Sequence, residues 1–328
     1  MSKNTYAIIG SGALGGFYGA KLQKSGLEVH FLLHSDYQHV LKNGLIIESK
    51  DGDFTLPKIN AYNNTNKMPK CDVILVALKT TQNHLLPELL PPLCQDNNIV
   101  LLLQNGLGAE PEIAKIIGEE RVIGGVCNLA SNKIGYGHIR HIDYGLIRIG
   151  KYAKNYQPAS ITNKMREISQ DFESAGIQVN LSEDLFRERW KKLVWNIPYN
   201  SLSVILDART DEMMGDTNTR NLITEIMQEV LEGAKSCQCE ISDSYIQNML
   251  DHTDKLNPYL TSMKIDYERR RPLEIESIIG NPLRMAGAAG IQLNKIGTLY
   301  QQLKFLDARN RQDIALCTGK KQQATGNR

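Results

Sequence analysis

The chain has 328 residues, 41% of them hydrophobic and 23% charged, and a formal net charge of +2. This length predicts about two domains, each with its own hydrophobic core. The charge is close to balance and no basic stretch alternates with aromatic residues, so nucleic acid is not an expected partner. The apolar runs at 73–78 and 99–103 are far shorter than the roughly 20 residues that a membrane helix needs, so no membrane partner is expected.

The start of the chain and its cysteines bear on location and metal binding. The first residues lead directly into a predicted strand, without the charged and apolar segments of a signal peptide, so we expect a cytoplasmic protein. Six cysteines are scattered along the chain, and only Cys237 and Cys239 lie close together. One Cys-x-Cys pair without a second pair is a poor zinc signature. Reduced thiols and no metal site are therefore expected.

A glycine-rich turn follows the first predicted strand, residues 5–9, and precedes a helix that ends before Gly26. In such a turn the first glycine permits the tight bend, the second lets the backbone approach a pyrophosphate, and the third allows close helix-to-strand packing. The helix N-terminus adds N–H groups and a partial positive charge. A purely structural turn is the alternative, but a second predicted strand at 28–33 favours nucleotide binding. The expected dinucleotide-binding residues are Gly10, Ser11, Gly12, Ala13, Leu14 and Gly15.

The first half of the chain alternates predicted strands and helices. The strands are expected at 5–9, 28–33, 72–78 and 98–103. This alternation is typical of a parallel sheet with helices on both faces. Residues 45–59, interrupted by a turn at 51–52, indicate extra strand or hairpin material, and residues 135–142 and 146–149 indicate further, antiparallel strands.

The pattern changes near residue 183, where β-branched runs disappear. Amphipathic helical patterns follow at 184–206, 217–237, 242–266, 273–289 and 295–309. The predicted fold class is therefore α/β, with a Rossmann-type doubly wound parallel sheet in the N-terminal domain and an all-α C-terminal domain. We expect a dinucleotide-binding domain at 1–182, a helical substrate domain at 183–312, and a disordered tail at 313–328, which is polar and poor in apolar residues.

The end of the second predicted strand should read the adenosine ribose of a dinucleotide. An acidic side chain directly at the strand end would favour NAD, because it accepts from the 2′-hydroxyl, whereas a 2′-phosphate needs donors. His34 and Ser35 are donors at this position, and Asp36 comes two residues late. NADP is therefore favoured. Ser35 or Asp36 could also cap the following helix.

Polar side chains follow two neighbouring strands of the predicted sheet. Lys79 comes after the strand at 72–78, and Asn105 follows the strand at 98–103. Ligands of open α/β sheets bind at the carboxyl ends of the strands. A lysine after a strand is often only a solvated end, but two such residues on one rim favour a role in binding.

The helix predicted at 184–206 carries an unusual polar face. Lys192, Asn196 and Asn200 are spaced by four residues and share one side of the helix, with Ser203 close by. Asparagine has poor helix propensity, and Pro198 removes a backbone hydrogen bond, so this face reduces helix stability. Such a face suggests a site. The alternative is that Lys192 only forms a surface pair with Glu188.

The segment from Ser262 to residue 280 is a second candidate. Pro272 fits the first turn of a helix, and Glu274 in that turn borders an apolar face. A carboxylate there could favour the helix dipole, meet a lysine or meet a substrate. The run Arg269 to Arg271 has a solvated helix start as its default interpretation.

These motifs together resemble the 2-dehydropantoate 2-reductases, also called ketopantoate reductases. The similar segments span nearly the whole chain. They are Gly10-Ser-Gly-Ala-Leu-Gly15, Leu78-Lys79, Asn105-Gly-Leu-Gly108, Trp190-Lys-Lys192-Leu-Val-Trp-Asn196, Arg271-Pro-Leu-Glu274-Ile and Leu299-Tyr300. The glycine turn is shared by many dehydrogenases, but its ordered combination with the lysine–asparagine helix and the Glu-Ile segment is specific.

The resemblance implies an NADPH-dependent reduction of 2-dehydropantoate to (R)-pantoate, a step toward pantothenate and coenzyme A. It implies that Lys192 is the general acid and that Glu274 holds the oxygen functions of the substrate. It further implies that Asn196, Asn200 and Ser262 contact the substrate. The implied cofactor-lining residues are Lys79, Asn105 and Ala130.

Two departures from the family pattern keep alternatives open. His34 stands where the family commonly has an arginine, which weakens the implied NADP preference. Thr210 stands at a substrate-side position that is often asparagine, so a reductase of another branched 2-oxo acid is the second interpretation. A non-catalytic NADP(H)-binding regulator is the third. The sequence leaves the oligomeric state open, with a homodimer as one option.

Overall fold

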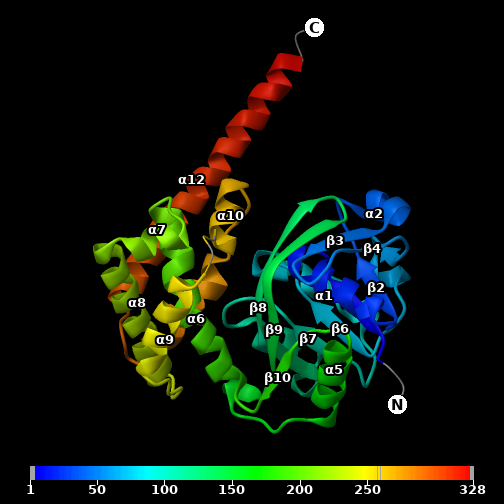
Figure 1. Ribbon diagram of the computed structural model, residues 1–328, viewed down its shortest axis with the longest axis horizontal. Helices are drawn as coiled ribbons and strands as arrows, with labels where there is room; N and C mark the ends of the chain where they lie inside the picture. The colour runs from blue at the N-terminus through cyan, green and yellow to red at the C-terminus, as the bar shows by residue number, and fades with distance from the viewer. Residues whose placement is uncertain (1–3, 257, 259, 326–328) are drawn as a thin grey trace. The chain divides into compact units, whose positions relative to one another are not determined.

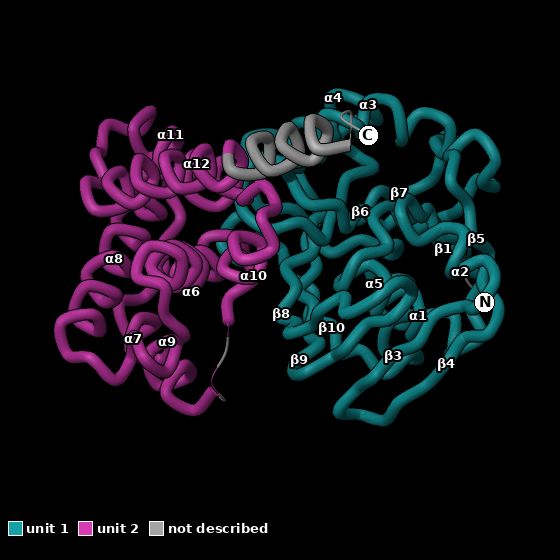
Figure 2. Tube along the Cα trace, turned by 90° about the horizontal axis from the view of Figure 1, so that it is seen from above, with its two compact units in different colours: residues 1–188 teal, residues 189–328 magenta. Residues whose placement is uncertain are grey.

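The computed structural model describes residues 4–325 apart from 257 and 259, with side chains as far as Gln312. The chain divides into two compact units, residues 1–188 and 189–328, which Figure 2 colours separately. The division falls inside helix α6, Leu185–Ile205. The sequence places the domain boundary a few residues earlier, at 182/183.

Unit 1 contains a parallel sheet with the strand order of a dinucleotide-binding fold. The order β5-β2-β1-β6-β7-β8 joins six parallel strands. Their bounds are β1 Tyr6–Ile9, β2 Val29–Leu32, β5 Asn60–Tyr62, β6 Val73–Val76, β7 Ile99–Leu102 and β8 Val122–Gly135. This order corresponds to the 3-2-1-4-5-6 arrangement of Rossmann sheets. The predicted α/β, doubly wound fold is confirmed.

Helices and apolar strands form the core of unit 1. All residues of β1 and β6 are buried, as expected for parallel strands covered on both faces. Tyr6, Phe17, Tyr18, Phe31 and Phe172 are among the largest side chains that are fully buried. The helices are α1 Ala13–Lys24, α2 Tyr37–Asn43, α3 Leu86–Leu89, α4 Ala109–Ile117 and α5 Asn163–Ser174, and several connections contain short 3₁₀ turns.

A long antiparallel hairpin extends the sheet beyond β7 (Figure 1). The strands predicted at 135–142 and 146–149 are wrong as separate elements, since residues 138–142 and 146–149 both lie in β9, His138–Lys151, but the predicted antiparallel pairing is observed. Their partner is β8, which the sequence analysis missed. The turn lies at 136–137, and the break that suggested two strands is an irregularity at Tyr144 and Gly145, which have φ values of 63° and 147°.

Three further strands lie beside this hairpin. β3, Leu45–Ser49, and β4, Phe54–Leu56, pair antiparallel, which confirms the hairpin predicted at 45–59. β3 also pairs with β9, and β10, Val179–Ser182, pairs with β9 in parallel. These strands enlarge the sheet to the side of β8 that faces away from β7.

Helices are the only regular secondary structure among the described residues of unit 2. After α6 come α7 Thr210–Gly215, α8 Thr217–Ser236, α9 Ser244–Asp254, α10 Ser262–Glu268, a π-helical turn Glu276–Gly280, α11 Asn281–Ala288 and α12 Asn294–Thr325. The single helix predicted at 242–266 is wrong, because α9 and α10 are separate. Pro258 lacks an N–H donor, and Thr261 starts a new helix by capping α10. The tail predicted at 313–328 falls largely outside the description: side chains are described only as far as residue 312, and residues 326–328 are not described.

Within the described part of the chain, no helix combines the length and the apolar character needed to cross a membrane.

The third glycine of the turn gives a test of packing in unit 1. A Cβ atom at Gly15 would lie 2.4 Å from the carbonyl oxygen of Gly10 and 2.9 Å from Cβ of Ala77. We expect Gly15→Ala to destabilise unit 1 by about 1–3 kcal/mol through overpacking, measured by urea unfolding. Gly287→Ala is the matched control, since a Cβ there meets nothing within 4 Å. Equal stability of the Gly15 variant and the wild type would contradict this packing.

Candidate active site

The glycine turn lies against the end of β6, where the strand order reverses between β1 and β6. Gly10 has a φ of 97°, and a Cβ atom there would lie 2.5 Å from the backbone nitrogen of Leu78. A Cβ atom at Gly12, in contrast, would meet nothing within 4 Å. The first glycine is therefore required by the protein itself, whereas the second leaves open space. Ligands of doubly wound sheets bind at such a switch point.

The N-terminus of α1 fits an anionic group. Its N-cap, Gly12, makes no side-chain hydrogen bond, and its first turn contains no acidic residue. Helix α4 differs, since Glu110 and Glu112 lie in its first turn. N–H groups that no side chain caps are the usual partners of a phosphate at a helix start. The backbone from Gly10 to Gly15 thus fits a pyrophosphate.

Ser11 fastens this turn to the neighbouring strand. Its hydroxyl donates to the carbonyl oxygen of Leu32 at the end of β2, at 2.9 Å. The hydroxyl hydrogen is therefore already used, and a contact from Ser11 to a phosphate would come from the backbone N–H. Ala13 and Leu14, which begin α1, are half-buried and can likewise offer only their backbone N–H groups.

The ends of β6 and β7 are joined by Gln104, which the sequence analysis missed. This residue is only 4% exposed, and its Nε2 donates to the Leu78 carbonyl at 2.9 Å and to Asn83 Oδ1 at 2.6 Å. Lys79 and Asn105 follow directly on the bridged positions. The two predicted rim residues therefore belong to loops that one buried amide holds together. The sequence signal that could have indicated this role is the position of the Gln104 amide, directly before Asn105 at the end of a predicted strand.

The Asn105 loop is also supported by Tyr156. Its hydroxyl accepts from the Gly108 N–H at 3.1 Å and donates to Glu110 Oε2 at 2.7 Å. Glu110 is fully buried, and the Tyr156 ring stacks on Phe186 with centroids 5.0 Å apart. This arrangement fixes the end of the loop. Ala130 lies in the part of β8 that continues past its pairing with β7.

The turn after β2 separates His34 and Ser35, which were predicted to read the ribose, from Asp36. His34 and Ser35 are exposed, but Asp36 is only 3% exposed. The Asp36 carboxylate lies 2.5 Å from Nζ of Lys133 and accepts from the Gly137 N–H at 3.2 Å. It makes no side-chain cap on α2, so that alternative is not observed for Asp36. His34 and Ser35 remain at the surface of the turn.

In unit 2, the asparagines of α6 are buried. Asn196 is 5% exposed and Asn200 is 2% exposed, while Lys192 is half-buried. Among the described residues, Oδ1 of Asn200 has no hydrogen-bond partner. A buried polar atom without a partner costs free energy, about 1–3 kcal/mol, unless a ligand satisfies it. This atom is the strongest sign of a polar ligand on that face.

A hydroxyl pair connects α6 to the segment that carries Ser262. Ser203 Oγ and Thr261 Oγ1 lie 2.7 Å apart, and both side chains are fully buried. Thr261 also accepts from the Lys264 N–H at 3.2 Å, which caps α10 just before Ser262. The structure thus places the start of α10 beside the turn of α6 that follows Asn200. Neither Ser203 nor Thr261 was assigned this role from sequence.

Glu274 is 4% exposed, in a segment held at both sides. The Leu273 N–H donates to Asp307 Oδ1 at 3.2 Å, and the Ser277 hydroxyl donates to the Glu274 carbonyl at 3.3 Å. Arg271 forms a 3.0 Å ion pair with buried Asp266. The Arg271 side chain is exposed, in line with the default interpretation of a solvated segment, and its ion pair links the loop before Glu274 to α10.

Two other ionisable side chains of unit 2 have structural partners. Burial opposes ionisation of Lys264, but its hydrogen bonds to Asp207 and Glu268 outweigh this and raise its pKa. Burial raises the pKa of Tyr199 to about 12, and its hydroxyl donates to the Met214 sulfur at 3.0 Å. Neither is suited to give up a proton near neutral pH.

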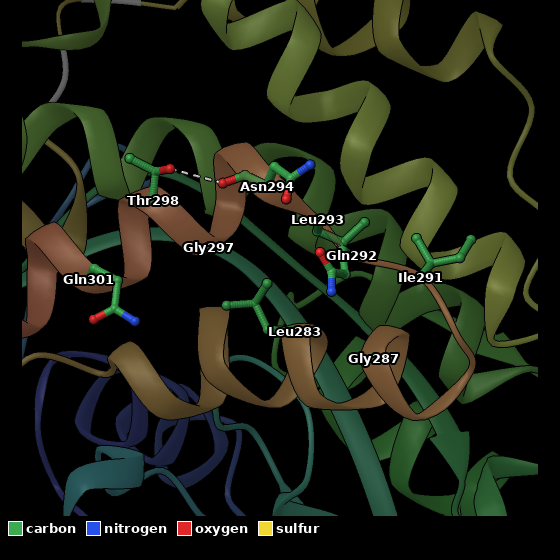
Figure 3. A pocket seen from close by; sticks show the side chains of 9 residues that line it. All are labelled: Leu283, Gly287, Ile291, Gln292, Leu293, Asn294, Gly297, Thr298 and Gln301. Atoms are coloured by element: carbon green, nitrogen blue, oxygen red, sulfur yellow. Dashed lines mark hydrogen bonds between the residues drawn. The ribbon is translucent and has the colours of Figure 1, made fainter.

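A surface hollow of about 430 Å³ lies between α11 and α12 (Figure 3). Its polar side chains are amides and one hydroxyl, with Thr298 donating to the Asn294 carbonyl at 2.9 Å. It contains none of the residues predicted from sequence, and no titratable side chain lines it. We also find no group of three metal-ligating side chains within the described residues.

Comparison with known proteins assigns the family. The family described as ketopantoate reductase PanE/ApbA matches residues 6–154, and its C-terminal counterpart matches residues 184–307. The chain belongs to the ketopantoate reductase family. It is 62% identical to a 2-dehydropantoate 2-reductase of Nostoc sp., over 95% of this chain and 98% of the relative.

Solved structures of the family have the same fold. A 2-dehydropantoate 2-reductase from Geobacter metallireducens is 39% identical, with a TM-score of 0.88 over 93% of this chain and 99% of that one. A dimeric ketopantoate reductase from Staphylococcus aureus has a TM-score of 0.78 at 20% identity, covering 93% of this chain and 99% of that one. The second likeness concerns the fold alone.

The open space at Gly12 provides a test of the nucleotide turn. We expect Gly12→Ala to weaken NADPH binding about tenfold or more, since the added methyl would occupy the face where a pyrophosphate approaches. The thermal unfolding midpoint should stay close to that of the wild type, because the methyl meets no protein atom within 4 Å. Fluorescence titration with NADPH measures the affinity. Unchanged affinity would show that the turn is not the phosphate site.

Proposed function

We propose that the chain reduces the C2 carbonyl of 2-dehydropantoate to give (R)-pantoate, with NADPH as reductant. The observation that carries this proposal is the buried polar face of α6, with Asn200 Oδ1 lacking a partner among the described residues, in a chain of the ketopantoate reductase family. A carbonyl substrate with carboxylate and hydroxyl groups can satisfy such a face. The reaction would be a step toward pantothenate and coenzyme A.

Substrate binding would use the polar groups of unit 2. Asn196 and Asn200 offer amide donors and acceptors, and Ser262 offers a hydroxyl at the start of α10. An Asn200 amide oxygen that accepts from the substrate hydroxyl would gain the hydrogen bond it otherwise lacks. Glu274, acceptor-only when ionised, would orient the substrate through its hydroxyl group. Its carboxylate sits in the segment that Asp307 and Arg271 anchor.

Lys192 would act as the general acid. A bound NADPH supplies the hydride for the carbonyl carbon. The C2 oxygen gains negative charge in the same step, and the Lys192 ammonium stabilises this charge and then donates its proton to the oxygen. Its half-buried position on α6 reduces competition from water. The neighbouring asparagines carry no charge and so do not neutralise the ammonium.

In unit 1, the cofactor would bind across the carboxyl ends of the parallel strands. The turn from Gly10 to Gly15 would hold the pyrophosphate through backbone N–H groups, and Lys79, Asn105 and Ala130 would line the rest. His34 and Ser35 would donate to the 2′-phosphate of NADP. The inward position of Asp36 supports this preference, because its carboxylate is engaged by Lys133.

The alternatives share the fold and differ in substrate or in whether the chain catalyses a reaction. Thr210 is 2% exposed at the start of α7, and its hydroxyl in place of an amide favours testing other branched 2-oxo acids. A non-catalytic regulator has no need of the lysine and asparagine face.

A homodimer is the oligomeric state that we propose, to be measured by light scattering.

A substrate panel tests the proposed reaction. The purified chain is mixed with NADPH and a set of 2-oxo acids, and the loss of reduced-nicotinamide absorbance is followed. We expect the highest kcat/KM with 2-dehydropantoate, because its hydroxyl can pair with the Asn200 amide. A higher value with another branched acid would favour the second interpretation. NADPH binding without turnover of any acid would support the regulator.

Variants of two adjacent lysines test the general acid. We expect Lys192→Ala to lower kcat about 10²–10⁴-fold, the usual contribution of a positioned proton donor. Lys191→Ala is the matched control, since Lys191 lies on the same helix with its ammonium 6.0 Å from the Tyr245 ring. Its kcat should change by less than about threefold. A normal kcat for the Lys192 variant would mean that another group supplies the proton.

A further inference from the structure

The turn after β2 contains one carboxylate, that of Asp36, and this side chain is buried. Asp36 is 3% exposed, and its carboxylate pairs with Lys133 and accepts from the Gly137 N–H. Both partners belong to the tip of the β8–β9 hairpin, about one hundred residues further along the chain. The carboxylate thus lies among groups that compensate its charge, while His34 and Ser35 stay exposed.

The hairpin tip packs directly on the segment that follows this turn (Figure 1). The Tyr136 ring lies 6.0 Å from the ring of His39 on α2, and the Gly137 carbonyl accepts from the Ile46 N–H at 2.8 Å. A Cβ atom at Gly137 would lie 2.8 Å from the Gly44 carbonyl oxygen and 2.9 Å from a Val40 methyl. This close packing holds Lys133 at Asp36.

We propose that Lys133 sets the preference of this turn for a 2′-phosphate by cancelling the charge of Asp36. An uncompensated carboxylate so close to the ribose end would repel a phosphate dianion and could accept from a free 2′-hydroxyl instead. When the Asp36–Lys133 ion pair forms, the two charges cancel. His34 and Ser35 can then donate to the 2′-phosphate without repulsion from the Asp36 carboxylate. Lys133 is therefore a positioning and specificity residue, acting through Asp36.

This inference rests on the proposed nucleotide site and can be tested without catalysis. The ligands are 2′,5′-ADP, which is adenosine 2′,5′-bisphosphate, and 5′-AMP, which differ only in the 2′-phosphate, and calorimetry on the full chain gives the ratio of their dissociation constants. A purely structural role of the ion pair would change both affinities alike. The ratio isolates the effect of local charge.

Three variants form a charge series at this ion pair, and a fourth is the control. We expect Lys133→Met to lower the preference for 2′,5′-ADP about tenfold, and Asp36→Asn to raise it several-fold. The double variant Asp36→Asn/Lys133→Met restores the net charge and should return the ratio to within about threefold of the wild type. Lys50→Met, which breaks the Lys50 and Asp143 pair on the same sheet, should leave the ratio unchanged. The differences should shrink as salt increases.

The outcomes separate this inference from the proposed function. A ratio in Lys133→Met equal to that of the wild type would overturn the inference alone. A double variant that behaves like Lys133→Met would also overturn it, because Lys133 would then act by touching the phosphate. Should Lys133→Met fail to fold, Asp36→Asn and the double variant still decide. A wild type that binds neither nucleotide would overturn the cofactor proposal, and this inference with it.

Discussion

The contact of the Gly10 turn with the end of β6 is the constraint on which unit 1 depends. Side chains at Gly10 or Gly15 would collide with backbone or side-chain atoms, so β1, α1 and β6 can approach this closely only with glycine at both positions. The hydrogen bonds that connect the neighbouring strand ends also start from this contact. Ser11 connects the turn to β2, and Gln104 connects the residue packed on Gly10 to β7. Four strand ends are thereby held together at the point where the strand order reverses.

In unit 2, tertiary packing rather than glycine holds the polar face of the candidate site. This face lies on one helix, α6, which contains Pro198 and two asparagines and yet is buried over most of its length. Tertiary packing compensates for these weak helix formers. Trp195 stacks on Tyr199 at 4.8 Å and donates to Thr253 at 3.0 Å, while Ser203 binds Thr261. Rigid anchors on both sides leave the asparagines fixed in position.

The sequence predicted the elements whose signals are local. Four strands of the parallel sheet, β1, β2, β6 and β7, are short apolar runs next to turns, and α6 and α8 show clear amphipathic periods, whereas the three-residue strand β5 was not predicted. Strand β8 was not predicted, because Gly124, Gly125 and the polar residues from Asn128 on are not typical of a strand. Its formation depends on pairing with β9, which no local pattern reveals. The same holds for α9 and α10, which were merged because both share one helical period.

The candidate site follows the same rule. The faces and strand ends that carry Lys79, Asn105, Lys192 and Asn196 could be predicted from spacing, whereas their supports could not. Gln104, Tyr156 and Lys133 act through contacts that depend on the fold, and the inward turn of Asp36 depends on a hairpin that forms much later in the chain. Spacing gives the position of a side chain but not its partner.

The hydrogen bond between Asp36 and Gly137 joins positions 101 residues apart. Contacts of such long sequence separation form slowly, since a large loop must close before they contribute. The first two strands and their glycine turn leave the ribosome well before the hairpin tip is made. In a nascent chain, the turn after β2 therefore lacks this contact with Gly137 until residue 137 has emerged. If the proposed nucleotide site is right, tight binding at this turn would need the β8–β9 hairpin in place, and the ligand would then stabilise chains in which these strands have already paired.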